Sequence, residues 1–217
     1  MVPLIIQFVP YLIYVAIVIL SLSVVIKLWT KKLNGKSLCL VGPACSGKTT
    51  FLYWLTNHKF VKINDEDRTI RTQNVKVDSI IDGDTHFTIR TVFDTPGHYA
   101  LDGGKIFLKE IQANRYIIFF FDAKEYLTNK VYRENDVFPR LFSLWKVVKG
   151  SEKQLVLAGT HIDDESIKGR TKSQIAIDIQ SLIQTKEYTS IFQDYDTILC
   201  DLTTKEGFSS ILKAITK

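Results

Sequence analysis

The chain has 217 residues, of which 46% are hydrophobic and 24% are charged. This length suits one domain with a full core, and the composition excludes a disordered chain and a polytopic membrane protein. The net charge is +5, and most of it lies in residues 1–36, which carry four lysines and no acidic residue. Because the rest of the chain is nearly neutral, no direct nucleic-acid partner is expected.

The cysteines and histidines exclude two further classes of site. Cys39, Cys45 and Cys200 show no CxxC spacing, so neither a disulfide framework nor a thiolate zinc site is expected. The four histidines lie too far apart for a helical HxxxH metal pair.

An uncharged apolar segment opens the sequence. Residues 4–26 would form a helix about 35 Å long, which is enough to cross a bilayer. Three lysines and a tryptophan follow within residues 27–32, a cluster typical of the cytoplasmic membrane interface. The sequence therefore predicts a transmembrane anchor with its basic flank over residues 1–30, a linker over 31–36 and a folded domain over 37–217. Since the lysines follow the span, we expect a single-pass membrane protein whose domain lies in the cytosol.

The predicted elements after residue 36 alternate between strands and helices. Strands are expected at Ser37–Val41, Val75–Ile81, Thr85–Phe93, Tyr116–Phe121, Gln154–Ala158 and Thr197–Cys200. Helices are expected at Lys48–Leu55, Lys105–Gln112, Val137–Val148, Ser173–Thr185 and Phe208–Ile215. Asp82-Gly83-Asp84 marks a hairpin turn between the second and third strands. This order predicts a three-layer α/β fold with a mostly parallel six-stranded sheet and one antiparallel edge strand.

A glycine-rich motif lies between the first predicted strand and the first predicted helix. The segment Gly42–Thr49 fits the pattern GxxxxGK[ST], in which backbone N–H groups cradle phosphates at a helix N-terminus. In such a loop Lys48 reaches the β- and γ-phosphates and the hydroxyl of Thr49 binds Mg²⁺. The motif alone does not distinguish ATP from GTP. The candidate phosphate-binding residues are Gly42, Pro43, Ala44, Cys45, Ser46, Gly47, Lys48, Thr49 and Thr50.

A second motif, Asp94-Thr-Pro-Gly97-His98, follows the third predicted strand. Together with the phosphate loop and the hairpin, it resembles the small P-loop GTPases. The resemblance implies that Asp94 orders Mg²⁺ through water, that the N–H of Gly97 contacts the γ-phosphate, and that His98 positions the attacking water, as in translational GTPases. A solvated loop histidine is the alternative for His98. The catalytic candidates are therefore His98, Lys48 and Gly97.

The segment Thr69–Thr72 resembles the switch I segment of Arf-like GTPases, in which a threonine completes the Mg²⁺ shell. Thr72 is our choice for this role and Thr69 is the alternative, while a hydrogen-bonded turn is the interpretation without a metal. The metal ligands that the resemblance implies are Thr49, Thr72 and Asp94.

Two further motifs stand where GTPases bind the base. Thr160-His161-Ile162-Asp163 resembles the THxD form of Roc GTPase domains, in place of the usual NKxD. The resemblance implies that Asp163 accepts hydrogen bonds from guanine N1–H and N2–H₂, a donor pair that adenine lacks. A helix N-cap is the alternative for this aspartate. Thr160 replaces an asparagine that braces the phosphate loop, and His161 replaces a lysine whose stem covers the base.

The last motif, Thr203-Thr204-Lys205, follows the last predicted strand and stands at the place of the SAK motif. The resemblance implies that the N–H of Thr204 meets guanine O6 and that the stem of Lys205 lies against the ring. The candidate base-binding residues are Thr160, His161, Asp163, Thr203, Thr204 and Lys205.

The overall layout narrows the resemblance. An N-terminal anchor, a short linker, a lone G domain and the triplet Phe121-Asp122-Ala123 resemble the β subunits of signal recognition particle receptors, and a prokaryotic membrane-tethered GTPase fits equally well. The resemblance implies GTP or GDP with Mg²⁺, a protein partner such as a receptor α subunit, and the endoplasmic reticulum membrane of a eukaryote or the inner membrane of a bacterium. Two functions stay open: a switch that hydrolyses GTP slowly, and a docking subunit that holds GTP with little or no hydrolysis.

Overall fold

The structure, a computed structural model, describes residues 36–57, 73–75, 80–82, 85–87, 89–94, 111–183 and 185–215, together with Tyr14 and Ile17. At Lys36 and over residues 73–94 it describes the backbone alone. The strands are β1 (Lys36–Val41), β2 (Gln73–Val75), β3 (Ile80–Asp82), β4 (Thr85–Phe87), β5 (Ile89–Asp94), β6 (Tyr116–Asp122), β7 (Gln154–Thr160) and β8 (Thr197–Leu199). The helices are α2 (Lys48–Asn57), α4 (Ala123–Thr128), the π-helix η3 (Tyr132–Val137), α5 (Phe138–Val148), α6 (Lys172–Ser181), α7 (Lys186–Asp194) and α8 (Lys205–Ile215).

The strands form a central sheet in the order β2-β5-β1-β6-β7-β8 and a separate pair, β3-β4. From β5 to β8 neighbouring strands run parallel, whereas β2 pairs antiparallel with β5. Strand β6 lies inside the sheet, and all seven of its residues are buried, as its apolar sequence on both faces requires. Because the parallel strands end at one edge, their following loops meet there, where open α/β sheets bind ligands.

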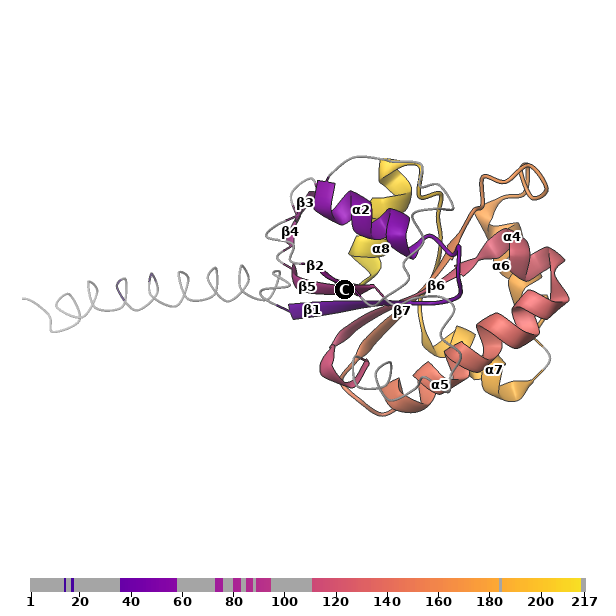
Figure 1. Cartoon of the computed structure of the whole chain (residues 1–217), viewed down its shortest axis with the longest axis horizontal. Coiled ribbons are helices and arrows are strands. Elements are labelled where there is room, and N and C mark those ends of the chain that lie inside the picture. Colours follow the sequence, from indigo (N-terminus) through magenta and orange to yellow (C-terminus); the bar gives the residue numbers. More distant parts are fainter. Residues whose placement is uncertain are drawn as a thin grey trace, which may run out of the picture.

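Helices cover both faces of this sheet (Figure 1). On one face α2 and α8 pack together, and the rings of Phe51 and Phe208 stack with their centroids 4.5 Å apart. On the other face lie α4, α5, α6 and α7. Successive side chains of β6 alternate between the two cores, since Phe120 enters the first while Phe119 and Phe121 enter the second. The described chain is therefore a three-layer α/β unit.

Helix caps explain where the helices depart from the prediction. The predicted helix Ser173–Thr185 is shorter, because α6 ends at Ser181, and α7 follows where none was expected. Thr171 caps α6 by accepting the N–H of Gln174, and Thr185 caps α7 by accepting that of Tyr188. Hydrophobic periodicity extends the predicted helix beyond the end of α6, and it does not report the cap at Thr185 that starts α7. The predicted helix Lys105–Gln112 lies outside the described residues apart from its last two.

The predicted hairpin between Val75–Ile81 and Thr85–Phe93 is present, and the structure describes it in two parts. The first of these segments is divided between β2 and β3, and the second between β4 and β5. β3 and β4 pair with each other, with Asp82 opposite Thr85, outside the main sheet. β5 pairs antiparallel with β2, with Val75 opposite Val92, and its other edge pairs parallel with β1. The turn at Asp82-Gly83-Asp84 predicts this pairing, whereas its division between two sheets is not predicted.

The expected fold class needs correction because it includes a transmembrane helix. In the sheet, the four parallel strands β1, β6, β7 and β8 have described side chains, whereas β5 and the antiparallel strand β2 are described by their backbone alone. In the described part of the chain no helix has the length and apolar character that crossing a membrane requires. A span needs about 20 helical residues, whereas the longest described helices, α5 and α8, have 11 each.

The same finding corrects the expected location as a single-pass protein of the endoplasmic reticulum or the bacterial inner membrane. The prediction came from apolar composition over residues 4–26. Apart from Tyr14 and Ile17, this segment and the linker up to residue 35 lie outside the described residues.

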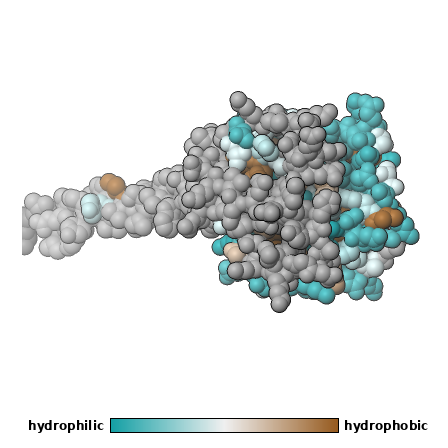
Figure 2. Space-filling view, viewed as in Figure 1, coloured by the Kyte–Doolittle hydropathy of each residue, from teal (hydrophilic) through white to brown (hydrophobic). Residues whose placement is uncertain are grey.

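The described surface is mainly hydrophilic on the side of α4 and α6, and its hydrophobic spots are small and separate (Figure 2). Among the side chains described after residue 36, Val131 and Ile177 are the most exposed large aliphatic ones, at 64% and 59% of their surface. Single apolar residues of this kind are normal on a folded protein.

Candidate functional site

Four loops follow β1, β6, β7 and β8 at the carboxyl edge of the parallel strands. They carry the phosphate loop, Asp122, the segment Thr160–Asp163 and the segment Asp201–Thr204. Thr160 is hydrogen-bonded to the phosphate loop, and Leu202 packs against Gly47. The predicted phosphate and base motifs thus lie at one edge of the sheet.

The shape of the phosphate loop depends on two glycines. Gly42 has a φ of +141°, and a Cβ there would lie 2.0 Å from the carbonyl oxygen of Phe120 in β6. Gly47 has a φ of +88°, and a Cβ there would lie 2.6 Å from Cδ1 of Leu202. Both positions combine a left-handed backbone with a close approach, which only glycine accommodates. Cys45, on the exposed part of the loop, also has a positive φ of 59°.

Lys48 supplies the positive charge of this loop. Its side chain is buried, and its ammonium donates to the carbonyl oxygens of Gly42, at 3.0 Å, and Pro43. The hydroxyl of Ser46 donates to the same carbonyl of Pro43 at 2.9 Å. The ammonium is therefore held inside the loop, beside the N-terminus of α2.

Thr160 ties the end of β7 to the phosphate loop. Its side chain is buried, and its Oγ1 lies 3.1 Å from the carbonyl oxygen of Ser46 and 3.2 Å from that of Phe121. A hydroxyl thus makes the bracing contact for which the resemblance to GTPases expects an asparagine.

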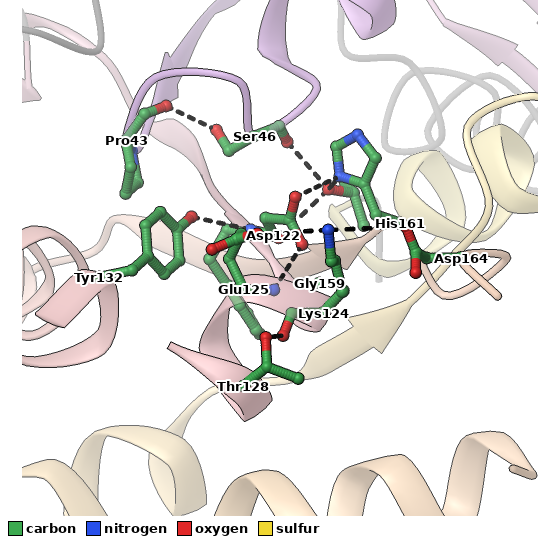
Figure 3. Close-up of polar contacts among 12 residues, drawn as sticks. Pro43, Ser46, Asp122, Lys124, Glu125, Thr128, Tyr132, Gly159, His161 and Asp164 are labelled. Atoms are coloured by element: carbon green, nitrogen blue, oxygen red, sulfur yellow. Dashed lines mark hydrogen bonds and ion pairs between the residues drawn. The ribbon is translucent and has the colours of Figure 1, made fainter. Parts of the chain in front are cut away.

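His161 and Asp122 extend this network (Figure 3). Nδ1 of His161 lies 2.9 Å from Oγ1 of Thr160 and 3.2 Å from Oδ2 of Asp122. The other oxygen of Asp122 caps α4 by accepting the N–H of Glu125, and the N–H of Asp122 donates to the hydroxyl of Tyr132. Burial raises the pKa of the Asp122 carboxyl, and the nearby His161 acts in the opposite sense. Burial also raises the pKa of Tyr132, so its hydroxyl stays neutral.

Asp164 holds the turn that follows. Its carboxylate accepts hydrogen bonds from the hydroxyl of Ser166 at 2.7 Å and from the N–H of Ser166 at 3.0 Å, and these bonds lower the pKa of Asp164. Nζ of Lys124 lies 3.8 Å from its second oxygen. Asp163, the predicted base-reading residue, is exposed beside this turn, so its carboxylate is accessible from solvent.

The loop after β8 is ordered by Asp201. Its Oδ1 accepts the N–H of Thr203 at 2.7 Å and the hydroxyl of Thr203 at 2.6 Å. The hydroxyl of Thr204 donates to the carbonyl of Asp201 and accepts the N–H of Gly207 in the first turn of α8. Lys205 begins α8 and is exposed. The predicted base loop is therefore held by its own hydrogen bonds, with the lysine at its surface.

Part of the predicted site lies outside the described residues. The residues concerned are Thr69, Thr72, Gly97 and His98. Of Asp94 only the backbone is described; it ends β5, in register with Leu40 of β1. Among the side chains that the structure describes, no cluster of three or more His, Cys, Asp or Glu residues is placed to hold a metal ion. Of the predicted Mg²⁺ ligands, Thr49 alone has a described side chain, on the first turn of α2.

Three residues of this edge were not predicted as site residues. Asp122 ends β6 and Asp201 lies two residues after β8, and a polar residue at the carboxyl end of a parallel strand is a signal that the sequence offers. Leu202 carried no such signal, because its contact with Gly47 arises only when the loops after β1 and β8 meet.

Comparison with known proteins assigns no family. The sequence matches no protein-family model, and no curated protein matches it either. The function is therefore argued from the residues of this chain.

Proposed function

We propose that this chain binds a guanine nucleotide together with Mg²⁺, as small P-loop GTPases do. The observation that carries the proposal is the buried ammonium of Lys48, which contacts the carbonyls of Gly42 and Pro43 inside a loop closed by two glycines. An ammonium has three donors, and an anionic phosphate is a stronger acceptor than a peptide carbonyl. The β- and γ-phosphates would therefore replace these carbonyl contacts, while the N-terminus of α2 adds N–H donors and its positive dipole end.

Mg²⁺ belongs to the same proposal. This ion prefers a few protein oxygens completed by phosphate oxygens and water. The hydroxyl of Thr49 would bind it directly, Asp94 would bind it through water, and Thr72 would complete the shell. The register of Asp94 beside Leu40, two residues before the loop, supports this arrangement.

The base is proposed to be guanine because of Asp163. Its exposed carboxylate follows Thr160, which is bonded to the phosphate loop, so the phosphate and base motifs are linked through the chain. A carboxylate accepts from the paired donors of guanine, whereas adenine would leave it without a partner. Thr204 and Lys205 are proposed to complete the base site from the loop after β8.

The nucleotide is proposed to control the binding of a protein partner, such as a receptor α subunit. In one form of this function the chain hydrolyses GTP slowly and acts as a switch. In the other it is a docking subunit that holds GTP with little or no hydrolysis. The rate of GTP hydrolysis distinguishes the two forms.

The test is competition for bound fluorescent GDP in the presence of Mg²⁺. We expect GTP and GDP to compete at least a hundred-fold better than ATP, on the order of the discrimination that a site gains from pairing buried hydrogen-bonding groups. Asp163→Asn should weaken GTP binding and improve the binding of xanthosine triphosphate, because the substitution exchanges the acceptor pattern that guanine needs. Glu165→Gln removes an exposed carboxylate from the same loop and should change neither. Equal competition by ATP and GTP would contradict the proposal.

A further inference from the structure

The hydroxyl of Thr160 has more acceptors around it than it has protons. Its Oγ1 lies within hydrogen-bonding distance of the carbonyl oxygens of Ser46 and Phe121 and of Nδ1 of His161. A hydroxyl carries one proton, and carbonyl oxygens can only accept. If Nδ1 were unprotonated it would compete for that proton at 2.9 Å, the shortest of the three distances. A proton on Nδ1 removes this competitor, so it favours the contact of Thr160 with the phosphate loop.

Asp122 is placed to keep that proton on Nδ1. Its Oδ2 lies 3.2 Å from Nδ1 of His161, and an ionised carboxylate only accepts. With Nδ1 protonated, the ring donates toward Oδ2 of Asp122 and Oγ1 of Thr160, and the hydroxyl proton of Thr160 is left for the carbonyls. Figure 3 shows the second ring nitrogen pointing away from Asp122. A carboxylate on one ring nitrogen selects the tautomer in this way in many histidine sites.

We propose that Asp122 is a positioning residue of the nucleotide site: it holds the proton on Nδ1 of His161 and thereby leaves the hydroxyl proton of Thr160 to the carbonyl oxygens, of which that of Ser46 in the phosphate loop is the nearer at 3.1 Å. Asp122 itself acts only through these two side chains. The effect on a bound nucleotide rests on the proposed function. The tautomer of His161 and the amide exchange of the phosphate loop can be measured without nucleotide, so they do not depend on that function.

The substitution Asp122→Asn separates this role from helix capping. Oδ1 of Asp122 accepts the N–H of Glu125 at the start of α4, and asparagine caps helices as well as aspartate does. If the amide oxygen of the asparagine still accepts the N–H of Glu125, the amide NH₂ group takes the place of Oδ2 and faces Nδ1 of His161 as a donor. Nδ1 should then lose its proton and the ring should become protonated on Nε2. The fold is kept while the hydrogen-bond direction is reversed.

The first test is nitrogen NMR of the full chain labelled with ¹⁵N-histidine, without nucleotide. We expect a proton on Nδ1 of His161, and its transfer to Nε2 in Asp122→Asn. Amide hydrogen exchange over residues 42–48 should become about five-fold faster in this variant, the size of one lost hydrogen bond. A neutral His161 protonated only on Nε2 in the unchanged chain overturns the proposal, as does a loop whose exchange is the same in both proteins.

The second test is the dissociation rate of fluorescent GDP. Asp122→Asn and Thr160→Val should each release GDP about five-fold faster, and the asparagine should add less than two-fold once Thr160 is valine, because both changes remove the same hydrogen bond. Effects that multiply would show that Asp122 acts by another route, and the proposal would be wrong. If the chain binds no guanine nucleotide, the proposed function fails, while the NMR and exchange results still decide the role of Asp122.

Discussion

Thr160 shows how a short side chain comes to depend on its neighbours. The asparagine that the resemblance expects there would carry both donors and an acceptor of its own, whereas a threonine hydroxyl has a single proton. Its contact with the carbonyl of Ser46 at 3.1 Å is therefore conditional on His161, and the state of His161 is conditional on Asp122. The side chains of Thr160, His161 and Asp122 together thus make the contact with the phosphate loop for which the resemblance expects one asparagine.

His98 is the residue on which the two forms of the proposed function differ. If it positions the attacking water, His98→Ala should lower the rate of GTP hydrolysis about ten-fold or more, the effect typical of losing a positioning or acid–base group. The affinity for GTP should change little, because His98 is not proposed to hold the nucleotide. Single-turnover hydrolysis, with nucleotide affinity measured in parallel, checks this expectation.

Lys48→Ala is the control for this experiment, since it should abolish binding by removing the main positive charge at the phosphates. A docking subunit would show negligible hydrolysis with or without His98. If the unchanged chain hydrolyses GTP readily and His98→Ala does so at the same rate, His98 is a solvated loop residue with no part in the reaction.

At the scale of elements, the sequence predicts strands and helices best where one pattern dominates. β6 is apolar on both faces and forms at its predicted position, and the spacing of Gly42, Gly47 and Lys48 predicts a loop between β1 and α2. α7 was not predicted because its start depends on one capping side chain, that of Thr185, which apolar spacing does not report. The contacts of Asp122 and Leu202 were missed because they join loops far apart in the sequence, which periodicity does not report.

The cap of α6 provides a test of this explanation. Oγ1 of Thr171 accepts the N–H of Gln174 at 3.1 Å and so satisfies one of the N–H groups that the first turn of α6 leaves without a helical partner. Thr171→Ala should therefore lower the free energy of unfolding by about 1 kcal/mol, as loss of a helix cap typically does. Urea denaturation measures the change. Thr171→Ser keeps the hydroxyl and should stay within a few tenths of a kcal/mol of the unchanged protein; an alanine variant as stable as the serine variant would show that this cap does not set the start of α6.

At the scale of the whole molecule, the sheet separates two cores that share their strands. Cys200 lies in the core beneath α2 and α8, and Cys39 lies in the core beneath α4, α5, α6 and α7. Both thiols are fully buried, whereas Cys45 is exposed on the phosphate loop. One cysteine therefore lies in each of the two cores, and the third lies in the proposed binding site.

Thiol alkylation should distinguish these three places. The thiolate is the reactive form, and burial raises the pKa of the Cys200 thiol to about 12, so Cys200 should not react while the protein is folded. We expect one fast-reacting thiol in the native protein. It should be absent from Cys45→Ser, and Mg²⁺ with GDP should slow its alkylation whereas ATP should not.

Because β1, β6 and β7 contribute side chains to both cores, Cys39 and Cys200 should become reactive at the same urea concentration. Exposure of one buried thiol well before the other would show that the two layers unfold independently, and rapid alkylation of either in the native state would contradict the packing of that core.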